Sequence, residues 1–499
     1  MNLFKSTTTF SFFTLISRIL GYIRDILIAI FLGSGPLADA FFVAFRIPNT
    51  FRRLFSEGTF NAAFVPSYAS ELTKGKEEAD VFATNIFSFL VLGLFFLVLI
   101  IEILMPLFVF LIAPGFSGEE EKMTLAINLT RITFPFLFFV SLSSFFSAIL
   151  NSHNRFAVAA AAPIVLNIFL ISILFFGKIL SDKLVYYLSY AVTIAGLTQF
   201  LFLLLFVKKF YSPKLIFKIK INEKIKIFFK KLLPSIFSSG VTQINILVGT
   251  IIASFQASAV SYLYYADRIY QINLAVAGIA IGTVVLPLLS KLIENKNIPE
   301  ILKIQNKALE LSLFLSLPAT VALFIASEPI VSGLFGYGSF SEISVQNSAK
   351  ALFYFAFGLP AFSIIKVFSS FFFARHNTKI PFYISLASVA INILISVSLF
   401  NRFGFIIIPI STSIASWFNA LLLYFFMVKK DFFIFNNIFK FKFPRIIFST
   451  AIMGIIFYLL LNQFSFQLNY NQNFKFFYLL LNILIALASY ILIYFLPGL

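Results

Sequence analysis

The sequence contains no cysteine, one tryptophan and two histidines, and only 12% of its 499 residues are charged. Without cysteine there is no disulfide framework, no thiol nucleophile and no cysteine-ligated zinc site. The two histidines, His153 and His376, are too few for a histidine-ligated metal centre, so we expect no metal and no cofactor. A soluble protein usually has about 25% charged residues, which argues against a soluble enzyme of several domains.

Hydrophobic residues take the place of charge: they make up 60% of the chain, and the mean hydropathy is +0.97. A helix needs about 20 apolar residues to cross about 30 Å of hydrocarbon. Stretches of this kind occur at 8–33, 37–70, 82–113, 123–150, 157–177, 184–207, 232–256, 260–290, 308–332, 345–374, 380–400, 404–428, 444–462 and 475–497. We predict an all-α polytopic membrane protein with about 14 transmembrane helices. The first stretch is interrupted by Arg18, Arg24 and Asp25, so we interpret it as a retained span and not as a signal peptide.

The Lys and Arg residues outside these stretches are distributed unequally. Alternate connections, beginning with the N-terminus, hold 24 of them, and the connections on the other side hold five. Cytoplasmic loops carry this excess of positive charge, so we expect both termini in the cytoplasm and an even number of spans. The formal charge of +18 is then a consequence of topology, and we expect no nucleic-acid partner.

A repeat divides the chain into two halves. Ser143–Phe146, a turn with His153-Asn154, and Asn167 are echoed about 225 residues later by Ser369–Phe372, a turn with His376-Asn377, and Asn392. The offset equals six spans, so the two halves have the same orientation, as in transporters built from parallel repeats. We predict four parts: an N-lobe at 1–207, a basic cytoplasmic linker at 208–231, a C-lobe at 232–430 and two extra helices at 431–499.

Nine cations lie inside the predicted spans: Arg18, Arg24, Arg46, Arg52, Arg53, Arg131, Arg268, Lys350 and Lys366. Each costs roughly 2.5–3.5 kcal/mol at the bilayer centre. Lys outnumbers Arg 25 to 4 outside the spans, whereas Arg outnumbers Lys 7 to 2 inside them. The planar fork and permanent charge of Arg suit bidentate binding of phosphate or carboxylate, although buried structural ion pairs also favour Arg.

Helical geometry groups several of these charges. At 100° per residue Asp39, Arg46, Arg53 and Glu57 lie within about 40° of one another, and Arg18 and Asp25 share a face with Gly21 between them. Arg52, Arg53 and Glu57 lie near the cytoplasmic end, where snorkelling is the alternative interpretation. The membrane cations exceed the acids in the first half, so we expect an anionic group to enter a water-accessible central cavity. No G-x-x-x-x-G-K motif of an ATP-driven motor is present.

Several motifs follow one another in order over roughly residues 1–430. They are Ser17–Asp25, Ala38–Phe45, Pro48-Asn49, Arg52-Arg53, Glu57-Gly58, Ala63–Pro66, Tyr264–Arg268, Gly282-Thr283, Leu286–Ser290 and Ile365–Val367. Together they resemble the MurJ (MviN) lipid II flippase family of the MOP exporter superfamily. The resemblance implies two six-helix lobes around a central cavity, followed by two helices that form a groove for a lipid tail. One departure is Arg46, where relatives carry Lys, and it keeps the charge.

The resemblance also implies a function and a set of functional residues. The protein would be no enzyme but a flippase for lipid II, the undecaprenyl-diphosphate-linked peptidoglycan precursor, working by alternating access in the bacterial inner membrane. Substrate-binding positions would be Arg18, Arg24, Arg52, Arg53, Arg268 and Lys366. Gating and ion-pairing positions would be Asp25, Asp39, Glu57, Asp267, Gly21, Asn49 and Ser261. We expect a monomer to suffice, with lipid II and membrane lipids as partners.

Four alternatives remain open from the sequence. A flippase for another polyprenyl-diphosphate sugar would use the same cations, and a MATE-like exporter of cationic drugs would show isolated membrane acids. A membrane transferase on the same lipid would need a metal-binding acid pair and a sizeable loop. A non-transporting scaffold for wall synthesis would tolerate neutralisation of the Arg residues.

Overall fold

The computed structural model describes residues 3–56, 59–180, 183–217 and 223–496. Within these residues every regular element is a helix, which confirms the all-α prediction. The chain divides into two compact units, Met1–Val260 and Ser261–Leu499, which are described separately.

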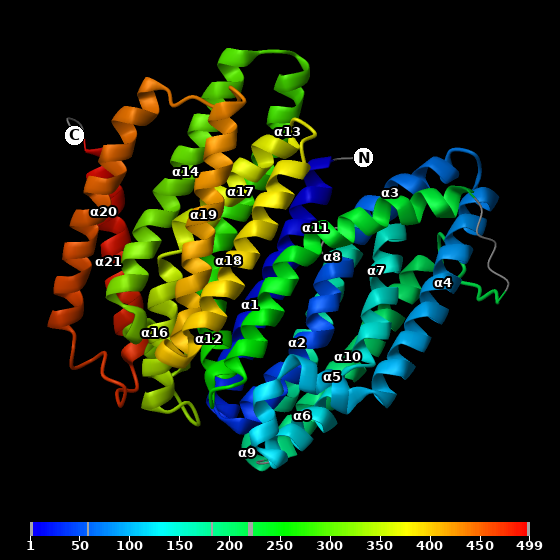
Figure 1. The fold of residues 1–499 in the computed structure, drawn as a ribbon, viewed down its shortest axis with the longest axis horizontal. Coiled ribbons are helices and arrows are strands. Elements are labelled where there is room, and N and C mark those ends of the chain that lie inside the picture. Colours follow the sequence, from blue (N-terminus) through cyan, green and yellow to red (C-terminus); the bar gives the residue numbers. More distant parts are fainter. Residues whose placement is uncertain (1–2, 57–58, 181–182, 218–222, 497–499) are drawn as a thin grey trace. The chain divides into compact units, whose positions relative to one another are not determined.

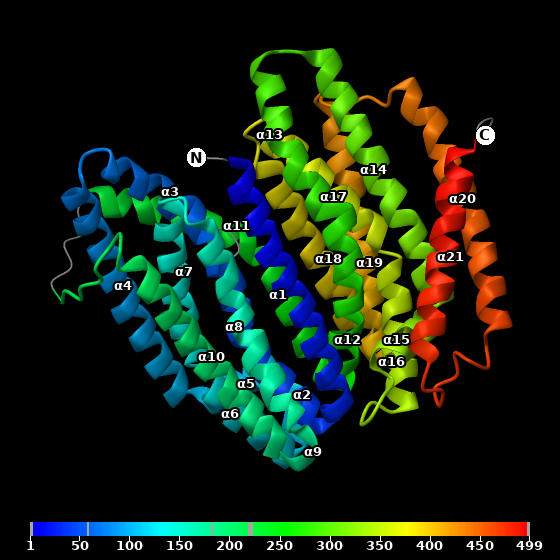
Figure 2. The ribbon, with the colours of Figure 1, turned by 180° about the vertical axis from the view of Figure 1, so that it is seen from behind.

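The first unit begins with a long apolar helix that packs along a later one: α1 lies against α8 (Figure 2). α2 packs on α6, and α7, α8 and α10 pack together. The helices are α1 (Leu3–Leu32), α2 (Pro36–Ser56), α3 (Thr59–Leu72), α4 (Lys76–Ile103), α5 (Met105–Ile112), the 3-10 turn η1 (Pro114–Gly118), α6 (Glu120–Thr133), α7 (Phe136–Ser152), α8 (Phe156–Phe175), α9 (Gly177–Leu180), α10 (Leu184–Val207) and α11 (Glu223–Ala253).

In the second unit α14 packs against both α17 and α20, and α20 and α21 lie side by side at one edge (Figure 1). Its elements are α12 (Ala259–Leu274), the π-helical turn η3 (Ala275–Ala280), α13 (Ile281–Glu294), α14 (Ile298–Ile325), α15 (Ser327–Phe335), α16 (Glu342–Ala356), α17 (Leu359–Phe373), α18 (Lys379–Phe403), the 3-10 turn η4 (Gly404–Ile406), α19 (Ile407–Lys429), α20 (Asn437–Gln463) and α21 (Lys475–Phe495).

Phenylalanine fills the core of each unit. In the first unit the ring of Phe64 is fully buried and stacks between Phe60 at 5.3 Å and Tyr68 at 5.5 Å. In the second, Phe368 and Phe371 pack around buried Phe433. Such ring pairs contribute about 0.5–1.5 kcal/mol beyond their buried area, so these residues stabilise helix packing.

Each of the fourteen predicted apolar stretches falls on one helix or a short run of helices. Among the described residues, nine runs are long and apolar enough to span a membrane, or ten if α16 and α17, bent by 44°, form one broken span. One of the nine runs, Lys379–Lys429, contains two helices that pack on each other, α18 and α19. The membrane-protein assignment holds, and the count of fourteen stays a prediction.

The boundary between the compact units differs from the predicted lobe boundary. The sequence placed 232–256 in the C-lobe, whereas α11 packs against α3 and α2 of the first unit (Figure 1). The lobes were defined by the internal repeat and the units by packing, so the four-part division at 207, 231 and 430 stays a prediction.

Candidate functional site

A buried network on α1 and α8 surrounds Arg24. Its Nε and Nη2 donate to Oδ1 of Asp25 at 3.0 and 2.8 Å, and its Nη1 donates to Oδ1 of Asn167 at 2.9 Å. Arg24 is 6% exposed and Asp25 2% exposed. Asn167 in turn donates Nδ2 to the backbone oxygen of Ser17 at 2.9 Å, so α8 holds the guanidinium and the backbone of α1 at once.

The guanidinium of Arg24 retains donor capacity in this network. It has five N–H groups, and three of them are used by the partners found among the described residues. One N–H on each terminal nitrogen therefore has no partner among the described residues. Gly21 faces the amide of Asn167, where a Cβ would make an ordinary contact at 3.8 Å, and Arg18 lies on α1 with an exposed side chain.

Asp39 lies at the beginning of α2 and is completely buried. Its Oδ2 accepts from Nζ of Lys122 at 2.9 Å and from the backbone N–H of Ser258 at 3.0 Å. Lys122 is 4% exposed, and its ammonium also lies 4.2 Å from the ring centroid of Phe116. The predicted gating acid is thus part of a buried ion pair that connects α2, α6 and the segment after α11.

Arg46, two turns along the same face of α2 as Asp39, contacts α11. Its Nη1 donates to Oγ1 of Thr250 at 2.6 Å and approaches the backbone oxygen of Ile246 at 3.5 Å. The cation therefore fastens α2 to α11 inside the first unit.

In the second unit Arg268 and Asp267 both have partners on their own helix, α12. The guanidinium of Arg268 donates from Nη2 to the Tyr264 hydroxyl at 2.9 Å and lies 4.7 Å from that ring's centroid. Asp267 accepts from the side-chain amide of Gln271. Stacking on an aromatic ring while donating sideways is a property of the planar guanidinium.

Lys366 lies on α17 with an exposed side chain. The helix backbone beside it is closely packed: a Cβ at Gly282 of α13 would lie 3.1 Å from the backbone oxygen of Lys366 and 2.9 Å from Oγ of Ser370. Gly278 is also close, with its added Cβ 3.5 Å from the Cβ of Lys366. Gly278 and Gly282 therefore allow η3 and α13 to pack closely against α17 beside Lys366.

The remaining predicted residues are less fully described. Asn49 is half-buried on α2, and Ser261 is buried on α12. The side chains of Arg52 and Arg53 and the whole of Glu57 lie outside the described residues. The expected face shared by Asp39, Arg53 and Glu57 thus stays a prediction.

Sequence reasoning did not assign three residues that the structure brings to these sites: Asn167, Lys122 and Thr250. Asn167 carried a usable signal, because it is a polar residue in an apolar span and belongs to the repeated motif. Lys122 was counted only as an outer-side loop cation, and Thr250 had no distinguishing pattern.

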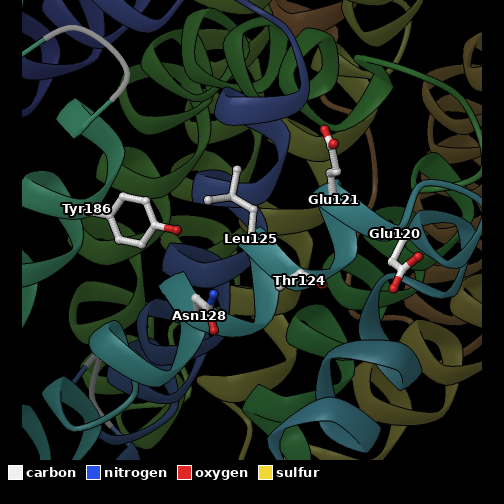
Figure 3. Close-up of a pocket in the computed structure, with 6 residues that line it drawn as sticks. All are labelled: Glu120, Glu121, Thr124, Leu125, Asn128 and Tyr186. Carbon is white, nitrogen blue, oxygen red and sulfur yellow. The ribbon is translucent and has the colours of Figure 1, made fainter.

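A hollow of about 510 Å³ lies elsewhere on the first unit, between α6 and α10 (Figure 3). Tyr186 of α10 points toward the lining residues of α6, which include Glu120 and Glu121. Its six lining residues include two carboxylates and no cation, so it does not suit a phosphorylated ligand. Among the described residues no group of acids and histidines is arranged to hold a metal ion.

Comparison with known proteins identifies relatives over nearly the whole chain. A family model described as lipid II flippase MurJ matches residues 28–481. A probable lipid II flippase MurJ from Rhizobium meliloti (strain 1021) is 39% identical over 480 residues, which cover 94% of this chain and 89% of that protein.

Solved structures give the same result for the fold. A lipid II flippase MurJ in an inward closed conformation superposes with a TM-score of 0.82 at 28% identity, covering 97% of each chain. An inward-facing multidrug resistance MATE transporter of the MOP superfamily superposes with a TM-score of 0.67, covering 83% of this chain and 94% of that one. At 16% identity the second match concerns the fold alone.

Proposed function

Because the chain belongs to the MurJ family of lipid II flippases, we propose that it moves lipid II from the cytoplasmic to the outer leaflet of the bacterial inner membrane. The observation that carries the proposal is the network of Arg24, in which a buried guanidinium is oriented by two partners and still has N–H groups to donate. A flippase is a transporter and not an enzyme, in agreement with the sequence prediction.

The diphosphate of lipid II is the chemical group that Arg24 would recognise. Arg binds phosphate through parallel N–H···O bonds, and such charge-assisted bonds are about twice as strong as neutral ones. Asp25 compensates the buried charge in the absence of substrate, which reduces the cost of an isolated cation in the membrane. Arg18, exposed on the same helix, and Arg52 and Arg53 on α2 would add further positive charge.

The second unit would contribute Arg268 and Lys366 to the same substrate. Arg268 is oriented by Tyr264 on its own helix, and Lys366 is exposed on α17. Asp39 and Glu57 would serve as gating acids, with Asp39 holding the segment that follows α11 through Ser258. Alternating access of the two lobes to the headgroup, with the lipid tail remaining in the bilayer, completes the proposed mechanism.

The membrane potential would supply free energy for this transport. A negative charge that leaves a negative interior gains about 2.3 kcal/mol per 100 mV. We further propose that both termini are cytoplasmic, because the excess of Lys and Arg lies on the side of the termini. We also propose that a monomer suffices for transport.

Reconstitution into proteoliposomes tests the proposal. Purified protein should move fluorescently labelled lipid II, monitored by its accessibility to an added lipid-modifying enzyme, and an imposed potential should raise the rate. Arg24→Ala and Arg24→Lys should both lose transport. Arg402→Ala serves as the matched control, because Arg402 is exposed at the end of α18 and its guanidinium lies over its neighbour Phe403.

Substrate competition distinguishes lipid II from related lipids. Unlabelled lipid II should compete with the labelled substrate, and a polyprenyl-diphosphate sugar without the peptide should compete less well. Equal competition would assign the protein to polyprenyl-diphosphate sugars in general. Retained transport in Arg24→Ala would place the anion site away from the network.

A further inference from the structure

Two segments far apart in the sequence are bound to their units in the same way. Residues 208–217 follow α10, the sixth predicted span, and residues 430–436 follow α19, the twelfth. A Lys-Lys pair lies at each helix end: Lys208-Lys209 is followed directly by Phe210-Tyr211, and Lys429-Lys430 is followed by Asp431 and then Phe432-Phe433. The two aromatic pairs are 222 positions apart.

In the first unit the two aromatic residues insert between helix ends. Phe210 stacks on His153 at the end of α7, with ring centroids 4.5 Å apart and planes 18° apart. Tyr211 is 1% exposed, lies 6.0 Å from the ring of Phe145 on α7 and shares a 3.2 Å hydrogen bond between its hydroxyl and Oγ1 of Thr84 on α4.

The same segment is held by one polar side chain of α4. Ser88, which is completely buried, accepts from the backbone N–H of Ile216 at 3.0 Å and donates to the backbone oxygen of Lys214 at 3.5 Å. A single hydroxyl thus satisfies an acceptor and a donor two residues apart in a segment without secondary structure.

The second unit repeats this arrangement with different residue types. Phe432 lies under the guanidinium of Arg375 at 4.4 Å, and Arg375 also donates from Nη2 to the backbone oxygen of Phe432 at 3.2 Å. Phe433 is 1% exposed, with its ring 6.2 Å from that of Phe371 on α17.

The polar anchor of the second unit is Asn306 of α14, the helix that corresponds to α4 in the repeat. Its Nδ2 donates to the backbone oxygen of Ile434 at 2.9 Å, and its Oδ1 accepts from the backbone N–H of Asn436 at 3.1 Å. The atoms held are again a carbonyl and the N–H two residues later, each 220 positions after its counterpart.

The turns that receive the aromatic residues also match. After α7 the N–H of Arg155 donates to Leu150 O at 2.8 Å, and after α17 the N–H of Asn377 donates to Phe372 O at 3.0 Å. The residue before each donor has a positive φ, 60° at Asn154 and 56° at His376, which is the helix-ending motif with a left-handed residue. The structural offset is 222, so His153 corresponds to Arg375 and not to His376.

We propose that residues 208–217 and 430–436 are equivalent straps, each of which ties the cytoplasmic ends of the third, fourth and sixth helices of one repeat into a single rigid body. The straps remain docked while the protein changes conformation. The residue types differ between the two straps, but both insert an aromatic pair and both are held by one polar side chain, so the mode of attachment is what they share. The claim that they stay docked during transport rests on the proposed function, whereas their anchoring does not.

Hydrogen exchange of the full-length protein in lipid nanodiscs tests the anchoring. Removal of one net hydrogen bond of about 1 kcal/mol corresponds to roughly fivefold faster exchange. Ser88→Ala should therefore accelerate exchange of peptides from 208–217 by about that factor and leave 430–436 unchanged, and Asn306→Ala should do the reverse.

A matched control and a milder variant accompany this test. Ser172→Ala removes a hydroxyl of α8 that bonds only to its own helix, at Ile168 O, and should alter neither strap. Tyr211→Phe keeps the buried ring and removes the bond to Thr84, so it provides a second measurement if Ser88→Ala does not fold. Unchanged exchange of 208–217 in both variants would overturn the anchoring.

Cross-linking tests whether the strap stays docked, and the absence of native cysteine makes an introduced pair unambiguous. The double variant Thr84→Cys, Tyr211→Cys is joined by a short bifunctional thiol reagent, and the same variant treated with a monofunctional reagent is the control. Equal lipid II transport by both samples is expected. Transport by the control but not by the cross-linked protein would show that the strap must release, and would overturn the proposal. Absence of transport in both the wild-type and the control samples would instead refute the proposed function and leave the hydrogen-exchange result unaffected.

Discussion

Asn167 should control transport through Arg24, although it was not predicted to belong to the site. The Asn167→Leu substitution keeps the branching at Cγ and the number of side-chain heavy atoms, and removes both the bond to Arg24 and the bond to the Ser17 backbone. Asp25 still holds Arg24 through two N–H groups. The guanidinium should then rotate about that carboxylate instead of keeping one orientation.

The magnitude follows from the bond that is lost. A hydrogen bond to a charged group contributes about 1.5–3 kcal/mol, and each 1.4 kcal/mol is a factor of ten. If this bond orients Arg24 toward substrate, the initial rate of lipid II transport in proteoliposomes should fall roughly 10- to 100-fold. Insertion and purification yield should be retained, because the α1–α8 contact extends along both helices.

Asn85→Leu is the control for loss of a buried amide. Asn85 is 4% exposed on α4, and its Nδ2 donates to the backbone oxygen of Val81 in its own helix. The reasoning fails if Asn85→Leu lowers transport as much as Asn167→Leu, or if Asn167→Leu transports at the wild-type rate. Asn167→Asp adds a second carboxylate beside Arg24, so it should abolish transport while increasing thermal stability relative to Asn167→Leu.

Three further predictions concern stability. Asp39→Asn should destabilise the protein by about 3 kcal/mol, because the buried ammonium of Lys122 loses its partner at 2.9 Å and is left with the largely exposed carboxylate of Glu119 at 4.0 Å. Thermal unfolding in detergent measures this, and the double variant with Lys122→Met should recover a large part of the loss. Gly282→Ala should cost about 1–3 kcal/mol, because its Cβ would lie 2.9 Å from a hydroxyl of α17 and overpacking forces the helices apart; an unchanged melting temperature would contradict it. Burial raises the pKa of Glu71, but hydrogen bonds from Lys224 and Lys74 outweigh burial and lower the pKa below its ordinary value of 4.5. The ionised carboxylate therefore stabilises the folded protein above pH 4.5, and this contribution is lost as the pH falls through the lowered pKa. Glu71→Gln should remove that loss and flatten the acid side of the pH–stability curve.

The sequence predicted the helical membrane fold, because the length and hydropathy of each apolar stretch are local properties of the chain. The orientation drawn from the Lys and Arg bias and the count of fourteen spans stay predictions, and helix breaks inside the apolar stretches were not predicted. α4 and α5 are separated by a break at Leu104, α16 and α17 bend at residues 357 and 358, and α12 and α13 are joined by a π-helical turn. Apolar composition continues through all of these breaks, so hydropathy does not locate them.

The functional roles of the site residues stay a prediction, but their contacts can be compared with the sequence. Helical spacing placed Asp25 on the face of Arg18, and the structure also pairs Asp25 with its neighbour Arg24. Spacing did not identify the partner of Asp39, because it relates a residue only to others on its own helix, and Lys122 lies 83 positions away. Asn167 lies 143 positions from Arg24, so helical spacing could not pair the two, although its polarity and its place in the repeated motif marked it in the sequence.

The choice between arginine and lysine inside the units follows the geometry of their partners. Lys122 interacts with the carboxylate of Asp39 at 2.9 Å, more distantly with that of Glu119 at 4.0 Å, and with an aromatic face, for which a point charge suffices. Arg24 binds Asp25 and Asn167 in two directions at once, and Arg268 stacks on Tyr264 while it donates to that residue's hydroxyl. Only a planar fork can do this. In a chain that otherwise uses Lys far more than Arg, an arginine within a span therefore indicates directed bonds and not charge alone, which is why Arg24→Lys should behave like Arg24→Ala.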